Sequence, residues 1–188
     1  MIPSPTKAPL YTDEKNEAHE LAVLATIASA NPDWNFTRSI EKKASFDGFI
    51  HKRQEKIGVW YDMPIAMCEI RRLNCSHATY ETAMISYTKV QQWQTFFPTT
   101  KIKCHFVVNW NDRLASADIE DIARYGDVRV SPFSKNRKNP ENDREIVFHY
   151  PVDKFRTLID GSTARKLHNV QSLKEAAAWV EAAKGQKR

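Results

Sequence analysis

The sequence predicts an α/β domain in which helices cover both faces of a central sheet. Two nearly continuous apolar runs, residues 65–70 and 103–110, are typical of strands that are buried on both faces. Apolar residues at helical spacing precede the first run and separate it from the second. The order helix, strands, helix, strand and helix favours a sheet between two helical layers.

The chain begins with a proline-rich segment that is followed by a helix. Residues 1–11 contain three prolines and are expected to form a flexible N-terminal arm. Thr12 is the expected N-cap, and the acidic residues after it suit the positive end of a helix. The spacing of apolar residues then predicts a helix over residues 13–30, which Asn31-Pro32 ends.

Short runs with strand-like patterns follow the first helix. They predict strands over residues 35–40, 46–51, 57–61 and 65–70. The polar stretch 51–56 is expected to be a turn. Residues 79–97 return to helical spacing and predict the second helix.

The C-terminal part alternates between strands and short helices. The buried strand 103–110 precedes a short helix over residues 116–125, for which Ser116 is the expected cap. Residues 133–144 are expected to form a basic loop, 145–150 a strand and 152–158 a helical turn.

The last helix has a capping signature at its start. Ser172 and Glu175 have the spacing of a capping box and predict a helix that ends at about residue 184. Residues 185–188 form a basic tail.

The composition limits the class of protein. Its 188 residues suit one domain over residues 12–184, and 28 Lys and Arg against 23 Asp and Glu give a charge of +5, which permits a polyanionic partner. No apolar run approaches the roughly 20 residues of a membrane helix, and no secretory signal is expected. The three cysteines form no CxxC pair, so a reducing cytoplasm is the expected compartment. No GxGxxG sequence or P-loop supports a nucleotide-binding fold.

Two acids interrupt the apolar strand sequences. Glu69 lies near the end of the run 65–70, and Asp47 follows Phe46 in an earlier run. A carboxylate in such a position loses solvation, and this is unfavourable unless the carboxylate is paired or bound to a metal. Acids on neighbouring strands can converge on Mg²⁺, which prefers carboxylate oxygens and water. The sequence therefore allows a divalent-metal site that could act on a phosphodiester.

Arg71 is expected beside this pair of acids. It lies two residues beyond Glu69, and strand side chains alternate with a period of two, so both point to the same face. A cation in this place could hold a phosphate.

The order of these residues resembles the PD-(D/E)XK nuclease superfamily. Asp47 followed by Glu69-x-Arg71 after an acidic helix is similar to the core motif of that superfamily, with Arg in place of the usual Lys. The likeness is closer to a set of small phage-encoded members. Their further motifs correspond here to Glu69–Arg72, to Tyr80, Met84, Ile85, Ser86 and Lys89 on a helix, to Trp110-Asn111-Asp112, and to Phe155-Arg156.

The resemblance covers roughly residues 13–160 and implies a fold and a set of roles. The implied fold is a restriction-endonuclease-like central mixed β-sheet flanked by helices. Asp47 and Glu69 would bind Mg²⁺ or Mn²⁺, and Arg71 would take the position of the catalytic lysine. Glu17 is preferred as the acid of the first helix, and Glu20 fits almost as well.

The arginine at position 71 leaves the activity open. Arginine stays charged under essentially all conditions, so it can clamp a phosphate but cannot act as a base. Lys89 could reach the same acids from the second helix and replace the missing lysine. The contrasting hypothesis is an inactive nuclease-like domain that binds nucleic acid or a protein, as a structural or regulatory phage component.

The sequence therefore predicts a metal-dependent nuclease that hydrolyses DNA in phage-type DNA metabolism. DNA-binding residues are expected in two places, at Arg71 and Arg72 and in the basic loop at Lys135, Arg137 and Lys138. The expected location is the cytoplasm, that of the host cell if the protein is phage-encoded. Homodimer formation and the choice between DNA and RNA stay open.

Overall fold

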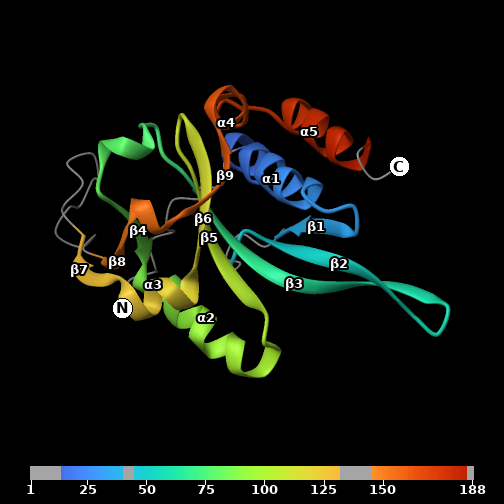
Figure 1. The fold of residues 1–188 in the computed structure, drawn as a ribbon, viewed down its shortest axis with the longest axis horizontal. Helices are drawn as coiled ribbons and strands as arrows, with labels where there is room; N and C mark the ends of the chain where they lie inside the picture. Colours follow the sequence, from blue (N-terminus) through green and yellow to red (C-terminus); the bar gives the residue numbers. More distant parts are fainter. Residues whose placement is uncertain (1–13, 40–44, 132–144, 186–188) are drawn as a thin grey trace, which may run out of the picture.

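A six-stranded mixed sheet forms the centre of the structure (Figure 1), a computed structural model that describes residues 14–39, 45–131 and 145–185. The strand order is β1-β2-β3-β5-β6-β9. Its strands are β1 (Trp34–Arg38), β2 (Gly48–Lys56), β3 (Val59–Arg72), β5 (Lys103–Asn109), β6 (Arg113–Asp118) and β9 (Arg156–Asp160). β3 and β5 are parallel and the other neighbours are antiparallel, so the sheet is mixed as predicted.

Helices cover both faces of this sheet. Figure 1 shows α1 (Glu14–Ser29), α4 (Gly161–His168) and α5 (Leu173–Gly185) on one side. On the other side lie α2 (Tyr87–Thr100) and α3 (Ile119–Tyr125). The α/β class predicted from the sequence is confirmed.

A second, smaller sheet was not predicted. Its order is β4-β8-β7, formed by β4 (Thr82–Ser86), β8 (Ile146–Pro151) and β7 (Asp127–Val130). The described residues also contain two 3-10 turns, η1 (His77–Thr79) and η3 (Val152–Lys154). The small sheet lies on the same side as α2 and α3, and its β8 residue Phe148 stacks on Tyr87 of α2.

Two apolar cores explain why the central strands read as continuous apolar runs. In β5, Phe106 and Val108 pack into the core under α2 and α3, whereas Val107 packs into the core under α1. In β3, Met67 joins the first core and Cys68 the second. Because both faces of such a strand are buried, its sequence does not alternate between apolar and polar residues.

Three predicted elements need correction. Residues 51–56 are not a turn but part of β2, which pairs with β3 up to Lys56↔Val59 around a tight turn at Ile57-Gly58. The helix expected over residues 79–97 begins only at Tyr87, because residues 82–86 form β4 and pair with β8. Of the motif residues expected on that helix, only Lys89 lies there.

Two further boundaries differ from the sequence prediction. Ser116 is in β6 and pairs with Val107, so α3 begins at Ile119 with Asp118 at its N-cap position. Residues 152–158 divide into the η3 turn and the start of β9. The helix α4 was not predicted.

Other predictions are confirmed by the structure. The helix α1, the strand β5 and the helix α5 lie close to where they were predicted. Ser172 Oγ accepts a hydrogen bond from the Glu175 backbone N–H, as a capping box requires. The N-terminal arm and the basic loop 133–144 lie outside the described residues. Among the described helices, none has the length and apolar character needed to cross a membrane.

Candidate active site

Asp47 is fixed beside Glu69 by the pairing of β2 with β3. The register places Gly48 opposite Cys68, and the Asp47 backbone N–H donates to the Cys68 carbonyl at 2.9 Å. The carboxylate of Asp47 points towards β3, where its Oδ2 accepts a hydrogen bond from the Ile70 backbone N–H at an N–O distance of 2.6 Å. The two acids therefore lie next to each other although 22 positions separate them in the sequence.

Lys89 joins this pair from the first turn of α2. Its Nζ lies 2.7 Å from Glu69 Oε2 and donates to the Ser45 carbonyl at 2.8 Å. The side chains of Glu69 and Lys89 are only 17% and 25% exposed. The structure thus brings the lysine of the second helix to the strand acid.

A third acid reaches the pair from α1. Glu20 and Glu17 both contact Arg38 at the end of β1, with N–O distances of 3.5 and 3.3 Å. Glu20 is the more buried of the two and lies within electrostatic range of Asp47 and Glu69. Of the two helix acids left open by the sequence, Glu20 is the one that faces the strand acids, while Glu17 lies farther out.

Burial and mutual repulsion shift the pKa values of these carboxyls. Desolvation raises the pKa of Glu69 to about 7, and the nearby charge of Asp47 adds to the effect against the attraction of Lys89. Desolvation and Asp47 likewise raise the pKa of Glu20 to about 7, although Arg38 opposes the shift. Desolvation also raises the pKa of Asp47, opposed by the hydrogen bond from Ile70. Clustered carboxyls with raised pKa values are typical of sites that bind cations or move protons.

The two arginines after Glu69 point to different surroundings. Arg71 donates from Nη1 to the Met84 carbonyl of β4 at 2.8 Å and is otherwise exposed. Arg72 donates to the Val170 carbonyl at 3.1 Å and to Asn16 at 3.3 Å, so it ties β3 to α1 and to the segment before α5. Lys135, Arg137 and Lys138 lie outside the described residues.

Sequence reasoning missed two members of the site. Arg38 balances the helix acids, and the Ser45 carbonyl positions Lys89. Arg38 is the one basic residue of the strand WNFTR and its last residue. A lone cation at the end of a strand is a signal by which the sequence could have indicated it. A backbone carbonyl leaves no mark in the sequence.

The donor set suits a hard divalent cation. Asp47 and Glu69 supply the carboxylate oxygens that Mg²⁺ prefers, and Lys89 Nζ lies 2.7 Å from Glu69 Oε2. Within the described ranges no three acids, histidines or cysteines have the spacing of a preformed metal cage. Lys89 and Arg38 form ion pairs with the acids of the site. A metal would therefore be held by two protein carboxylates with water completing its shell.

Comparison with solved structures finds similar folds, among them a viral nuclease and an archaeal Holliday junction resolvase. A nuclease from a fusselovirus matches 80% of this chain and 79% of its own, with a TM-score of 0.43 and 14% identity. A Holliday junction resolvase from the archaeal hyperthermophile Archaeoglobus fulgidus matches 80% of this chain and 95% of its own, with a TM-score of 0.35 and 9% identity. No protein-family profile and no curated protein sequence matches the chain.

The mixed sheet carries α1 on one face and α2 on the other, which is the arrangement implied by the sequence resemblance. The fold is an α/β fold with a central mixed sheet flanked by helices. In this fold the chain presents its acids where β2 begins and where α1 and α2 approach the same part of β3. The roles of these residues rest on their own geometry, because the fold alone does not specify an activity.

Proposed function

We propose that this protein is a metal-dependent nuclease that hydrolyses DNA phosphodiester bonds. The observation that carries the proposal is that Asp47, Glu69 and Lys89 come together from the start of β2, from β3 and from α2, with Glu20 of α1 within electrostatic range. Buried acids of like charge cost stability unless they serve a ligand or a reaction. A phosphodiester and a divalent cation are the ligands that fit this combination of charges.

Each residue has a distinct role in the proposed site. Asp47 and Glu69 would hold Mg²⁺ or Mn²⁺, which supplies Lewis-acid stabilisation of charge on the phosphate. Lys89, held by Glu69 and the Ser45 carbonyl, directs its ammonium protons to the phosphate oxygens. Glu20 has a pKa near 7 and is suited to accept a proton from the attacking water. Arg71 clamps the phosphate with the guanidinium nitrogens that do not bind Met84.

In this scheme the acid Glu20, and not the residue at position 71, acts as the general base. Arg71 keeps its charge, and it donates to a backbone carbonyl that orients it along β4. Glu17 supports the site indirectly, because it shares Arg38 with Glu20 and so helps to set the charge around that carboxyl.

A cleavage assay tests the proposal. The purified protein is incubated with supercoiled plasmid, linear duplex, single-stranded DNA and RNA in Mg²⁺ or Mn²⁺. We expect metal-dependent cleavage of DNA that falls at least about a hundredfold in Glu69→Gln and in Asp47→Asn, because each removes a charge from the metal site. Glu14→Gln, at the exposed start of α1, is the matched control and retains activity.

The alternative function is an inactive nuclease-like domain that binds nucleic acid or a protein. The close ion pair of Lys89 with Glu69 favours it, since this pair already neutralises one of the two metal-binding carboxylates. Calorimetric titration with Mg²⁺ and Mn²⁺ separates the two functions. Absence of cleavage on every substrate together with absence of metal affinity would replace the nuclease proposal with this alternative.

A further inference from the structure

The outer half of the β2–β3 hairpin stands away from the rest of the structure. Figure 1 shows it extending beyond the sheet, and we call residues 52–63 the ribbon. Its large apolar side chains are exposed, with Ile57 at 93% and Val59 at 65%. Tyr61 and Met63 are exposed to about 40% each. A contiguous exposed apolar surface of this kind is typical of an interaction site.

The two faces of the ribbon differ in charge. Cross-strand pairing places Lys52 with Met63, Gln54 with Tyr61 and Lys56 with Val59 on one face. This face, which we call the lysine face, carries two cations and no acid. The opposite face pairs Arg53 with Asp62 and Glu55 with Trp60, so its acids outnumber its single cation.

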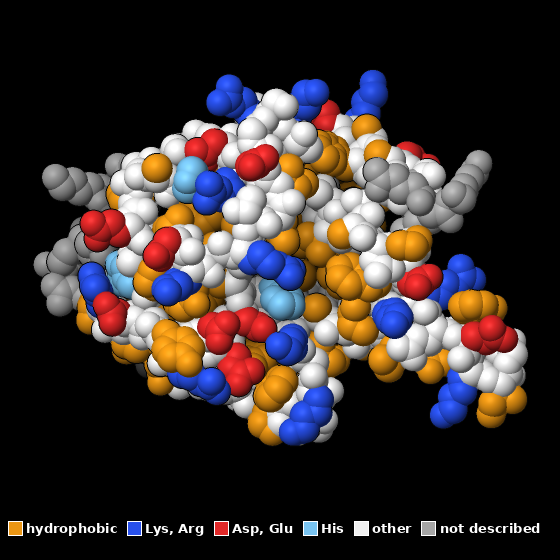
Figure 2. All heavy atoms as spheres, viewed as in Figure 1, with side chains coloured by type: hydrophobic (Ala, Val, Ile, Leu, Met, Phe, Trp, Pro, Cys, Tyr) orange, Lys and Arg blue, Asp and Glu red, His pale blue; other side chains and the backbone are white. Residues whose placement is uncertain are grey.

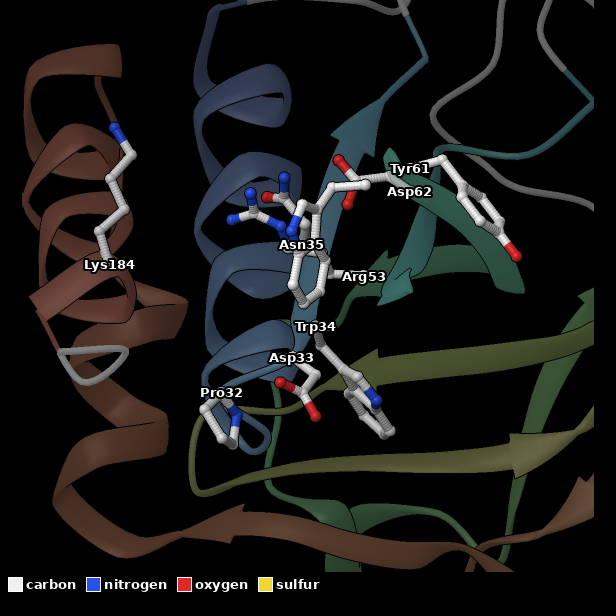
Figure 3. A pocket seen from close by; sticks show the side chains of 9 residues that line it. Pro32, Asp33, Trp34, Asn35, Arg53, Tyr61, Asp62 and Lys184 are labelled. Atoms are coloured by element: carbon white, nitrogen blue, oxygen red, sulfur yellow. The ribbon is translucent and has the colours of Figure 1, made fainter. Parts of the chain in front are cut away.

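The opposite face borders an open hollow at the base of the ribbon. This hollow of about 920 Å³ is lined by Arg53 and Asp62 from the ribbon, Asp33 beside β1 and Lys184 from α5 (Figure 3). These four lining charges balance, so the hollow offers no preference for an anion. The electrostatic preference of the ribbon lies on the lysine face.

The tip of the ribbon has an unusual residue. Ile57 and Gly58 have φ angles of 55° and 71°, which is the left-handed region that a two-residue hairpin turn requires. Asn-Gly is the favoured pair for such a turn, whereas a β-branched residue with positive φ is a genuine outlier. An exposed isoleucine in this conformation is unfavourable for the isolated chain, so its side chain is better explained by a partner.

We infer that the ribbon binds duplex DNA beside the cleavage site, with the lysine face against the phosphates and Ile57 against the bases. This inference rests on the proposed nuclease function. A two-stranded ribbon fits the major groove, and apolar side chains at protein tips contact bases or wedge between them. The nine residues of β2 span about 30 Å from the acids to the tip, close to one turn of DNA.

Charge removal tests the contact with phosphates. Affinity for a 40-base-pair duplex is measured by fluorescence anisotropy at several salt concentrations, with the full chain carrying Glu69→Gln so that the DNA stays intact. Lys52→Gln with Lys56→Gln is expected to lower the slope of log affinity against log salt by about 2, since each phosphate contact contributes about 0.9. Lys166→Gln with Lys174→Gln, on α4 and α5, removes the same charge elsewhere and leaves the slope unchanged. An equal change in both double variants would overturn the inference.

The turn residue tests the contact with bases. Ile57→Asn creates the favoured Asn-Gly turn, so the thermal midpoint should stay the same or rise. We expect DNA affinity to fall at least about fivefold nevertheless, because the apolar contact is lost. Ile57→Leu keeps an apolar tip and should retain most of the affinity. Undiminished affinity in Ile57→Asn would contradict the contact.

Self-association is the competing outcome. Sedimentation velocity of the unsubstituted protein and of Ile57→Asn shows whether the ribbon joins two copies of the chain. A dimer that dissociates on Ile57→Asn, with a salt slope that the lysine pair does not change, would overturn the DNA contact in favour of a dimer contact. Ribbon-dependent DNA binding without cleavage by the unsubstituted protein would instead reject the nuclease function and leave the ribbon contact intact.

Discussion

The buried position of Glu69 makes the charged form of its carboxyl unfavourable for folding. Its pKa is raised from about 4.5 to about 7 by burial and by Asp47, so the folded protein holds this proton more tightly than the unfolded chain does. The contribution of Glu69 to stability is therefore fully present below pH 4.5 and is lost as the pH rises through 7. Stability lost in this way at a functional site is a common trade-off.

Glu69→Gln should therefore stabilise the protein at alkaline pH. The neutral amide avoids the desolvated charge but also gives up the ion pair with Lys89, so we expect a net gain on the order of 1–2 kcal/mol at pH 8 and almost none at pH 4.5. Urea unfolding at the two pH values measures it. A loss of stability at pH 8 would show that the Lys89 ion pair outweighs the desolvation of the carboxylate.

Among the individual residues of the site, the sequence indicated some and not others. Asp47 and Glu69 stood out because an acid within an apolar strand requires an explanation. The choice between Glu17 and Glu20 depends on less than one turn of α1, which the apolar spacing of the helix could not resolve. The pairing of Lys89 with Glu69 depends on where α2 begins, and the sequence placed that start too early.

Two helices and the strand β5 are joined by a buried polar contact. His19 of α1 lies 2.9 Å from Asn109 at the end of β5, and both side chains are almost fully buried. In the better-satisfied orientation of the amide, Asn109 accepts from His19 Nε2 and from the backbone N–H of His168 in α4. Burial lowers the pKa of His19 to about 3, with the charge of Arg72 as a second cause.

This contact should make the packing of α1 sensitive to acid. The unfolded chain binds a proton at His19 below pH 6.5 and the folded protein does not until about pH 3, so stability is complete above 6.5 and falls as the pH is lowered towards 3. We expect a loss of about 1 kcal/mol per pH unit from this group below pH 6. His19→Gln, which does not titrate, should flatten the dependence in urea unfolding between pH 4 and 7. An unchanged slope would place the sensitivity elsewhere.

The helix α5 depends on the cap that its sequence predicted. Ser172 Oγ accepts from the Glu175 N–H, and the Glu175 carboxylate accepts from the Gln171 N–H at 2.7 Å. We expect Ser172→Ala to lower the free energy of unfolding by about 1 kcal/mol, since the first turn loses an acceptor. Ser172→Asp should restore most of it in the same denaturation experiment. Equal stability of the alanine and aspartate variants would show that the cap contributes nothing.

Elements that the sequence misplaced are those decided by distant partners. Residues 82–86 have apolar side chains that fit a helix spacing as well as a strand, and pairing with β8 more than sixty residues away selects the strand. The polar stretch 52–56 continues as a strand because β3 offers a partner up to the tight turn at Gly58. By contrast, α1 and α5 carry their own spacing and end signals and were predicted closely.

For the whole molecule, the order of elements was sufficient to predict a central sheet between two helical layers but not the second sheet β4-β8-β7. Apolar runs at β3 and β5 required a core on each face, and the two cores are present. The face shown in Figure 2 mixes acidic and basic side chains, so the net charge of +5 is not concentrated in one broad patch on that face. DNA binding would then depend on local groups such as the ribbon and the site around Lys89.

Divalent metal should stabilise the whole fold in a pH-dependent manner. A ligand that binds only the folded protein adds about 2.7 kcal/mol at a hundred times its dissociation constant. Mg²⁺ must displace the proton of Glu69, whose pKa lies near 7, so the rise of the thermal midpoint should be large at pH 8 and should shrink as the pH falls below 7. Each displaced proton weakens the apparent affinity by about tenfold per pH unit. Glu69→Gln should abolish the rise while Glu14→Gln preserves it, and a rise that persists in Glu69→Gln would place the metal away from these acids.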